Sequence, residues 1–147
     1  MMAGGQVFAT WLGEIDKFVQ ANKDHAVFGA QFALLEEALN NYRDIQNTMA
    51  GYLGQGKLGM IGFFATRILH ATGYIYAAKL LLEQALICQK KVEEIGKENF
   101  EYPFYAGKVA SAKFFCHNIL PIVGTIQRVI KEGDNSIMEA PEAAFTV

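Results

Sequence analysis

A glycine-rich segment is the first of several places where residue types and spacing could support chemistry. Residues 54–59, GQGKLG, match the G-x-G-x-x-G pattern that binds a dinucleotide pyrophosphate. That pattern works between a strand and a helix of a βαβ unit, whereas a long amphipathic helix is expected before Gly54. Residues 51–58 also approach a phosphate-binding P-loop, but Leu58 stands where the metal-binding Ser or Thr belongs. The segment therefore favours a helix–helix turn over a nucleotide site.

The histidines and cysteines do not have the spacing of a metal or nucleophile site. Di-iron centres in helical bundles use Glu-x-x-His pairs, and no glutamate stands three residues before His25, His70 or His117. Cys116 and His117 are adjacent, and adjacent side chains on a helix point about 100° apart, so they do not form a nucleophile–base pair. We expect Cys88 and Cys116 to be buried, reduced thiols, and we predict no metal ligands or catalytic residues.

The charged residues offer one further candidate. The carboxylate pairs at residues 36–37 and 93–94 lie in polar stretches and are typical of solvated helix faces. Lys108 lies near the start of a helix expected to begin at Pro103, where the helix dipole disfavours a cation. A nearby anion, either Glu101 or a group on another domain, would explain this placement. A solvated surface lysine is the simpler alternative.

Composition limits the class of protein. The chain has 147 residues, of which 52% are hydrophobic and 19% charged, and its net charge is −2. That charge lacks the basic footprint of a nucleic-acid-binding protein. No cationic segment precedes an apolar one near the start, and Glu14 and Asp16 come early, so we expect no secretory signal and a cytoplasmic location.

Helical periodicity dominates the chain, and no segment predicts a strand. Residues 28–52 carry apolar side chains in alternating steps of four and three, which is typical of helices packed in a bundle. We predict an all-α fold, an up-down-up-down four-helix bundle with a short C-terminal helical tail, forming a single accessory domain over residues 1–147. The expected helices are 5–22, 28–53, 58–96 and 103–132, and the tail is 134–147.

The third predicted helix is unusually apolar. Between residues 58 and 88 apolar side chains occur on all sides, which indicates burial on more than one side. Arg67, His70, Lys79 and Glu83 interrupt the stretch, so we expect no membrane span there. Another protein surface is expected to cover its outer face.

Prolines and glycines mark the end of the chain. Pro103 suits the first position of a helix, Pro121 should kink or briefly interrupt that helix, and Gly133 should end it. Ser136 and Glu139 have the spacing of a capping box, which predicts a short final turn beginning at Ser136.

The segments FYAGKVASAKFFCHNILP and IKEGDNSIMEAPEAAF resemble the C-terminal end of long bacterial acyl-CoA dehydrogenases, in the accessory domain called acetyl-CoA dehydrogenase C-terminal-like. Weaker similarity is found in ILHATGYIYAAKLL (68–81) and GGQVFATWLGEI. The residues that match the family pattern are Phe104, Tyr105, Gly107, Lys108, Ala112, Phe114, Phe115, Leu120, Pro121, Gly133, Asp134, Ser136, Met138, Glu142, Ala144 and Phe145.

The resemblance implies a parent enzyme that uses FAD to oxidise acyl-CoA to enoyl-CoA. It also implies that the flavin-binding residues and the catalytic glutamate lie in upstream domains, so this chain alone would hold no cofactor and do no chemistry. Its expected partners are the remaining domains of such an enzyme or a second subunit, in a homo-oligomer. Candidate contacts to those partners are Arg67, His70, Tyr105, Lys108 and Phe114.

Two other readings of the sequence stay open. One is a stand-alone helical adaptor that forms homo-oligomers or binds another protein through an exposed apolar face. The other is a bundle that binds a small molecule in its apolar interior.

Overall fold

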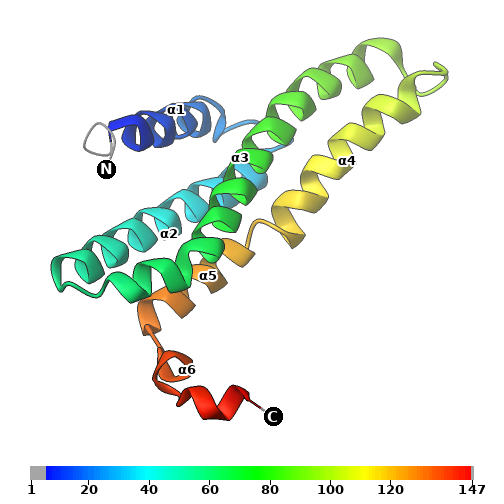
Figure 1. Ribbon diagram of the computed structural model, residues 1–147. Coiled ribbons are helices and arrows are strands. Elements are labelled where there is room, and N and C mark those ends of the chain that lie inside the picture. Colours follow the sequence, from blue (N-terminus) through cyan, green and yellow to red (C-terminus); the bar gives the residue numbers. More distant parts are fainter. Residues whose placement is uncertain (1–5, 147) are drawn as a thin grey trace.

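A computed structural model describes residues 6–146, and its regular structure in that range is entirely helical (Figure 1). The predicted all-α bundle with a short helical tail is confirmed. The elements are α1 (Gln6–Asn22), α2 (Gly29–Gly54), α3 (Leu58–Ile95), α4 (Tyr102–Asn118), α5 (Ile122–Glu132), α6 (Ser136–Glu139) and the 3-10 helix η2 (Glu142–Phe145).

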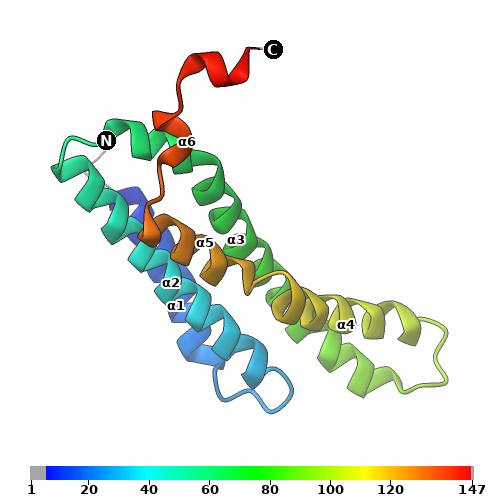
Figure 2. The same cartoon turned by 90° about the horizontal axis from the view of Figure 1, so that it is seen from below.

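Helix α2 is central to the packing, because α1, α3, α4 and α5 all contact it. Helices α3 and α4 form a long antiparallel hairpin whose far end projects beyond the other helices (Figures 1 and 2). The turn between α2 and α3 contains Gly56 at φ 72°, a left-handed conformation that glycine adopts without strain. The GQGKLG segment is thus a helix–helix turn, as its sequence context indicated.

The core is built from the inward faces of α1, α2, α3, α4 and α5. In α2 the apolar seam read from the sequence is buried, and Tyr42 is satisfied by a 2.7 Å hydrogen bond between its hydroxyl and that of Thr72 on α3. Burial raises the pKa of Tyr42, and the Thr72 hydrogen bond partly opposes that shift. The largest fully buried side chains are Tyr42, Phe28, Phe32, Phe64, Ile15, Leu35, Leu39, Ile45, Ile75, Leu82, Leu120 and Ile130.

The range 103–132, expected as one helix, is divided into α4 and α5. Helix α4 ends at Asn118 and α5 begins at Ile122, with Pro121 immediately before it. The backbone N–H groups of residues 119 and 120 both donate to the carbonyl of Phe115, at 2.9 and 3.0 Å. Leu120 is 1% exposed, so the break directs an apolar side chain into the core. Pro121 interrupts the helix, which was one of the two expected outcomes.

The stretch Tyr102–Glu132 is long and apolar enough to cross a membrane by length and composition alone. The sequence pattern had indicated residues 58–88 as the most apolar region. In the structure the stretch consists of two helices, and α5 buries Val123, Ile126 and Ile130 in the core. Because core helices pass the same test, the stretch is weak support for a membrane span.

The predicted capping box in the tail is wrong. Helix α6 already includes Ser136, and its hydroxyl does not cap the backbone. Instead Asp134 accepts hydrogen bonds from the backbone N–H and the hydroxyl of Ser136, at 3.1 and 3.0 Å. Gly133 lies in the left-handed region at φ 66° and ends α5 as expected. Asp134 thus accepts the hydrogen bonds of both Ser136 donors, and the capping box does not form.

Phe32→Ala should destabilise the fold by about 3–5 kcal/mol, because it leaves a cavity beneath α1 where Phe18 packs edge-on against the Phe32 ring. Phe100→Ala is the matched control, since Phe100 is 89% exposed and should change the free energy of unfolding by no more than about 0.5 kcal/mol. Urea unfolding followed by circular dichroism measures both. Equal effects would contradict this description of the core.

Candidate functional site

The two candidate contact residues on α3 are held by aromatic neighbours of the same helix. The guanidinium carbon of Arg67 lies 5.9 and 5.8 Å from the ring centres of Phe63 and Phe64. The ring of His70 lies 6.2 Å from that of Tyr74. Arg67 and His70 are both exposed. They are therefore available for contact with another protein surface, and aromatic stacking restrains their side chains.

Lys108 is exposed and lies over an aromatic ring, whereas the sequence left open a nearby anion or a solvated surface lysine. Its Nζ atom lies 5.6 Å from the ring centre of Phe104, and the Phe104 ring meets that of Tyr105 edge-on at 5.3 Å. Among residues 6–146, Lys108 forms no ion pair with Glu101 or with any other carboxylate. Phe104 is 62% exposed, so the cation–π pair stands on the surface of α4.

The five candidate contact residues do not form one site. Arg67 lies 28 residues before Ile95, the last residue of α3, whereas Lys108 lies six residues after Tyr102, the first of α4. At 1.5 Å per residue, these two side chains are separated by about 30 Å along the antiparallel hairpin. Phe114, which is 62% exposed, lies between these levels on α4. Whether any of them contacts a partner remains a prediction.

A row of exposed apolar side chains lies on the outward side of α3, and the candidate residues missed it. Leu69, Tyr76, Leu80 and Ile87 are between 39% and 69% exposed. The opposite side of the helix is buried against α2 and α4. We call the outward row the outer seam of α3, and define it as Gly62, Thr66, Leu69, Gly73, Tyr76, Leu80, Glu83 and Ile87.

The sequence carried a signal for this seam. Apolar residues on all sides of 58–88 predicted that an outer face would be exposed or covered by something else. The sequence alone does not say which side of α3 faces α2 and α4, so the seam could not be separated from the core face.

A part-buried polar pair joins α2 to α4. Gln31 is 5% exposed, and its Nε2 atom donates to Nε2 of His117 at 2.8 Å. The Oε1 atom of Gln31 is buried and has no hydrogen-bond partner within the described chain. His117 is exposed, and its hydrogen bond to Gln31 gives it a structural role between α2 and α4.

The thiols offer no nucleophile. Cys88 and Cys116 are both free and buried. Burial raises the pKa of the Cys116 thiol to about 11, which keeps it protonated at neutral pH. Among residues 6–146, no group of three or more His, Cys, Asp or Glu side chains could hold a metal ion.

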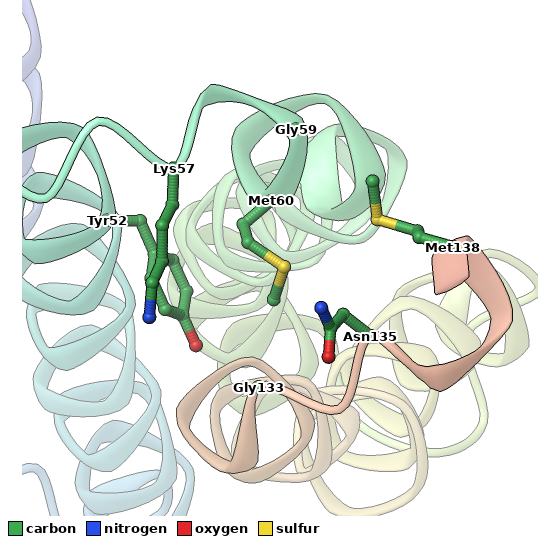
Figure 3. A pocket seen from close by; sticks show the side chains of 7 residues that line it. All are labelled: Tyr52, Lys57, Gly59, Met60, Gly133, Asn135 and Met138. Atoms are coloured by element: carbon green, nitrogen blue, oxygen red, sulfur yellow. The ribbon is translucent and has the colours of Figure 1, made fainter.

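A shallow pocket of about 280 Å³ lies between the α2–α3 turn and the tail (Figure 3). The Tyr52 hydroxyl at its wall donates to the carbonyl of Ile130 at 2.9 Å. Lys57 is the cationic side chain of the lining, and no carboxylate accompanies it there. The lining lacks an acid–base pair for catalysis. It consists of Tyr52, Lys57, Gly59, Met60, Gly133, Asn135 and Met138.

These features define a class of protein. A helical bundle with a long exposed apolar seam has the character of an interaction domain. Comparison with known proteins agrees. The family described as acetyl-CoA dehydrogenase C-terminal like matches residues 11–141, and the chain belongs to that family.

Several dehydrogenases contain a region similar to this chain. Two butyryl-CoA dehydrogenases of Syntrophomonas wolfei are 35% and 36% identical over 144 residues, which is 98% of this chain and 23% of each relative. The broad-specificity linear acyl-CoA dehydrogenase FadE5 of Mycobacterium tuberculosis is 33% identical over 146 residues, covering 96% of this chain and 24% of that protein. The chain spans about a quarter of the length of these relatives.

Gln31→Met should stabilise the fold by about 1 kcal/mol, because it removes a buried oxygen that has no partner and leaves an exposed histidine that water can solvate. His117→Ala should have the opposite sign and cost about 1–3 kcal/mol, because it leaves the whole Gln31 amide buried without a partner. Urea unfolding of the two variants gives the comparison. If Gln31→Met and His117→Ala destabilised the fold equally, the Gln31 oxygen would not be an unsatisfied buried group.

Cys116 should resist thiol reagents at pH 8. Its pKa of about 11 against an ordinary value of 9.0 leaves about a hundredfold less thiolate in the folded chain. Because the folded pKa is raised, the stabilising contribution of the protonated thiol is complete below pH 9 and is lost between about pH 9 and 11. Labelling with and without urea, followed by peptide mass spectrometry, measures this protection. Equal labelling rates in both conditions would contradict it.

Proposed function

We propose that this chain is the C-terminal helical domain of an FAD-dependent acyl-CoA dehydrogenase, in which it supports assembly and does no chemistry alone. The parent enzyme would oxidise acyl-CoA to enoyl-CoA, with the flavin and the catalytic base in its other domains. Its expected location is cytoplasmic, and its expected partners are those other domains or a second subunit.

One observation carries the proposal: nearly the whole chain matches about a quarter of each dehydrogenase relative. A dehydrogenase active site needs a flavin pocket and a positioned base. The described residues offer a shallow pocket with one lysine and no carboxylate, and two buried thiols, one with a raised pKa. A pocket and thiols of this kind suit a supporting domain better than a catalytic domain.

The outer seam supplies the physical means of support. Exposed apolar surface of this extent is typical of a protein interface, and its burial against another surface would stabilise the assembled enzyme by the hydrophobic effect. The exposed pair of Phe104 and Lys108 and the exposed Phe114 give a second candidate contact on α4.

A stand-alone helical adaptor is the second candidate, and the same exposed seam supports it. The two functions differ in what accompanies the chain. An accessory domain would be encoded next to flavin-binding and catalytic domains, or in one reading frame with them, whereas an adaptor would have no such neighbours.

The purified 147-residue chain, incubated with FAD and butyryl-CoA, should retain no stoichiometric flavin and should not reduce an electron-acceptor dye. Absorbance at the flavin bands and dye bleaching measure both properties. The Syntrophomonas butyryl-CoA dehydrogenase serves as the positive control. Stoichiometric FAD binding or acyl-CoA-dependent dye reduction by the chain would overturn the proposal.

A deletion in the relative tests the supporting role. Removing the region of the butyryl-CoA dehydrogenase that matches this chain should lower its melting temperature or its oligomeric mass. Unchanged stability and mass after the deletion would contradict a role in assembly.

A further inference from the structure

The tail that follows α5 has few ties to the helical bundle. Helix α6 and the 3-10 helix η2 contain no buried residue. Among residues 6–146, the hydrogen bonds of residues 134–146 all join two groups of the tail itself, such as the Asn135 amide and the Glu139 carboxylate at 2.8 Å. The position of the tail beyond Gly133 therefore depends on side-chain packing.

Met138 of α6 makes a packing contact with the bundle. Its methyl carbon Cε lies against Gly59 in the first turn of α3, where an added Cβ atom would meet that methyl group at 3.0 Å. Figure 3 shows the Met138 side chain directed from the tail toward the start of α3. Because Gly59 has no side chain, the methyl group reaches the backbone of the helix. This contact holds the tail beside the shallow pocket.

The Met138 thioether is open to solvent while it makes this contact. Met138 is 49% exposed, whereas Met60, which lines the same pocket, is 7% exposed. Met49 is partly buried against the core. Hydroperoxides oxidise methionine to its sulfoxide, and exposed side chains react most readily. Among residues 6–146, Met138 is thus the methionine most accessible to this reaction.

We propose that Met138 is an oxidation site that controls the attachment of the tail, because its thioether packs against α3 and its sulfoxide does not. In the reaction the O–O bond of a hydroperoxide breaks, one oxygen forms an S=O bond with the Met138 sulfur, and the rest leaves as an alcohol, or as water from hydrogen peroxide. The sulfur loses two electrons and the peroxide gains them. A methionine sulfoxide reductase reverses the oxidation with two electrons from a dithiol, which becomes a disulfide as water is released.

The sulfoxide weakens the contact because it places a polar oxygen where an apolar thioether packed. Removing such an oxygen from water without a hydrogen-bond donor costs free energy. The nearby Tyr52 hydroxyl already donates its proton to the carbonyl of Ile130 at 2.9 Å. Lys57 of the same pocket is exposed, so water solvates its ammonium group. The oxidised side chain is therefore better solvated away from α3.

Graded treatment of the full 147-residue chain with hydrogen peroxide tests the accessibility. Met138 should be oxidised about sevenfold faster than Met60, in the ratio of their exposed fractions of 49% and 7%. Peptide mass spectrometry measures both rates. In urea, where both side chains are exposed, the two rates should become equal. Equal rates in the folded chain would overturn the proposal.

Nuclear magnetic resonance of the chain with isotope-labelled methionine methyl groups tests the release. A nuclear Overhauser effect between the Met138 methyl group and the Hα protons of Gly59 should be present in the reduced chain. It should be lost when Met138 is oxidised and should return after treatment with a methionine sulfoxide reductase. Absence of this signal from the reduced chain, or its persistence after complete oxidation, would overturn the proposal.

Met138→Leu is the matched control for the oxidation, because it keeps an apolar side chain of similar volume and removes the sulfur. Peroxide should shift the backbone amide resonance of Gly59 in the unsubstituted chain and leave it in place in this variant. The variant also controls for oxidation of the other methionines and of Cys88 and Cys116. A peroxide-induced shift of equal size in both chains would exclude Met138 as the controlling site.

A second pair of variants tests the contact without changing Met138. Gly59→Leu would occupy the space of the Met138 methyl group and should make oxidation of Met138 about twofold faster, since a side chain that is 49% exposed becomes fully exposed. Gly62→Leu, one turn along α3, should leave the rate unchanged, because an added Cβ atom there meets nothing within 4 Å. Circular dichroism should show both variants folded. An equal effect of the two substitutions would overturn the contact, and neither result depends on flavin or acyl-CoA.

Discussion

The fold depends on the close approach of α3 to α2 and α4. The buried side of α3 carries Ala71, Ala78 and Ala85, each fully buried and seven residues from the next. These small side chains let neighbouring helices come near, and Phe64, Ile75 and Leu82 fill the space between them. On α4, Ala112 and Cys116 are also small and fully buried. Larger residues at these positions would separate the helices and open the core.

This packing explains why α3 is apolar on two sides. Its inward side packs against other helices of the chain, whereas its outward side stays largely exposed among the described residues. An exposed row of leucine, tyrosine and isoleucine costs solubility unless another surface covers it. Under the proposed function this surface has a use, because it would hold the domain against the rest of a larger enzyme.

Much of the fold could be predicted from the sequence, because amphipathic periodicity and helix-terminating residues act locally. The helical character of α2 and the end of α5 at Gly133 follow from such signals. The break before Pro121 was foreseen as one of two outcomes, since proline removes one hydrogen bond but leaves the neighbours to decide how far the helix opens. The capping role predicted for Ser136 was wrong because Asp134, two residues earlier, accepts the hydrogen bonds of the Ser136 backbone N–H and hydroxyl.

The candidate site was less predictable. For Lys108 the sequence left open a nearby anion or a solvated surface position, and the structure places the exposed lysine over Phe104, four residues earlier on the same helix. A sequence does not distinguish these partners, because Phe104 lies about one helical turn and Glu101 about two turns before Lys108. The outer seam was hidden for a different reason: the inward and outward sides of α3 are both apolar, and three-dimensional packing alone separates them.

A chimaera, in which this chain replaces the matching region of a Syntrophomonas butyryl-CoA dehydrogenase, tests the central claim most directly, namely that the outward side of α3 is an interface. The account predicts that Leu69→Glu in the chimaera lowers its melting temperature, because the substitution places a charge in the interface. The same substitution in the isolated chain should leave the melting temperature unchanged, since Leu69 is 69% exposed there. Equal melting temperatures of the two chimaeras would contradict the claim.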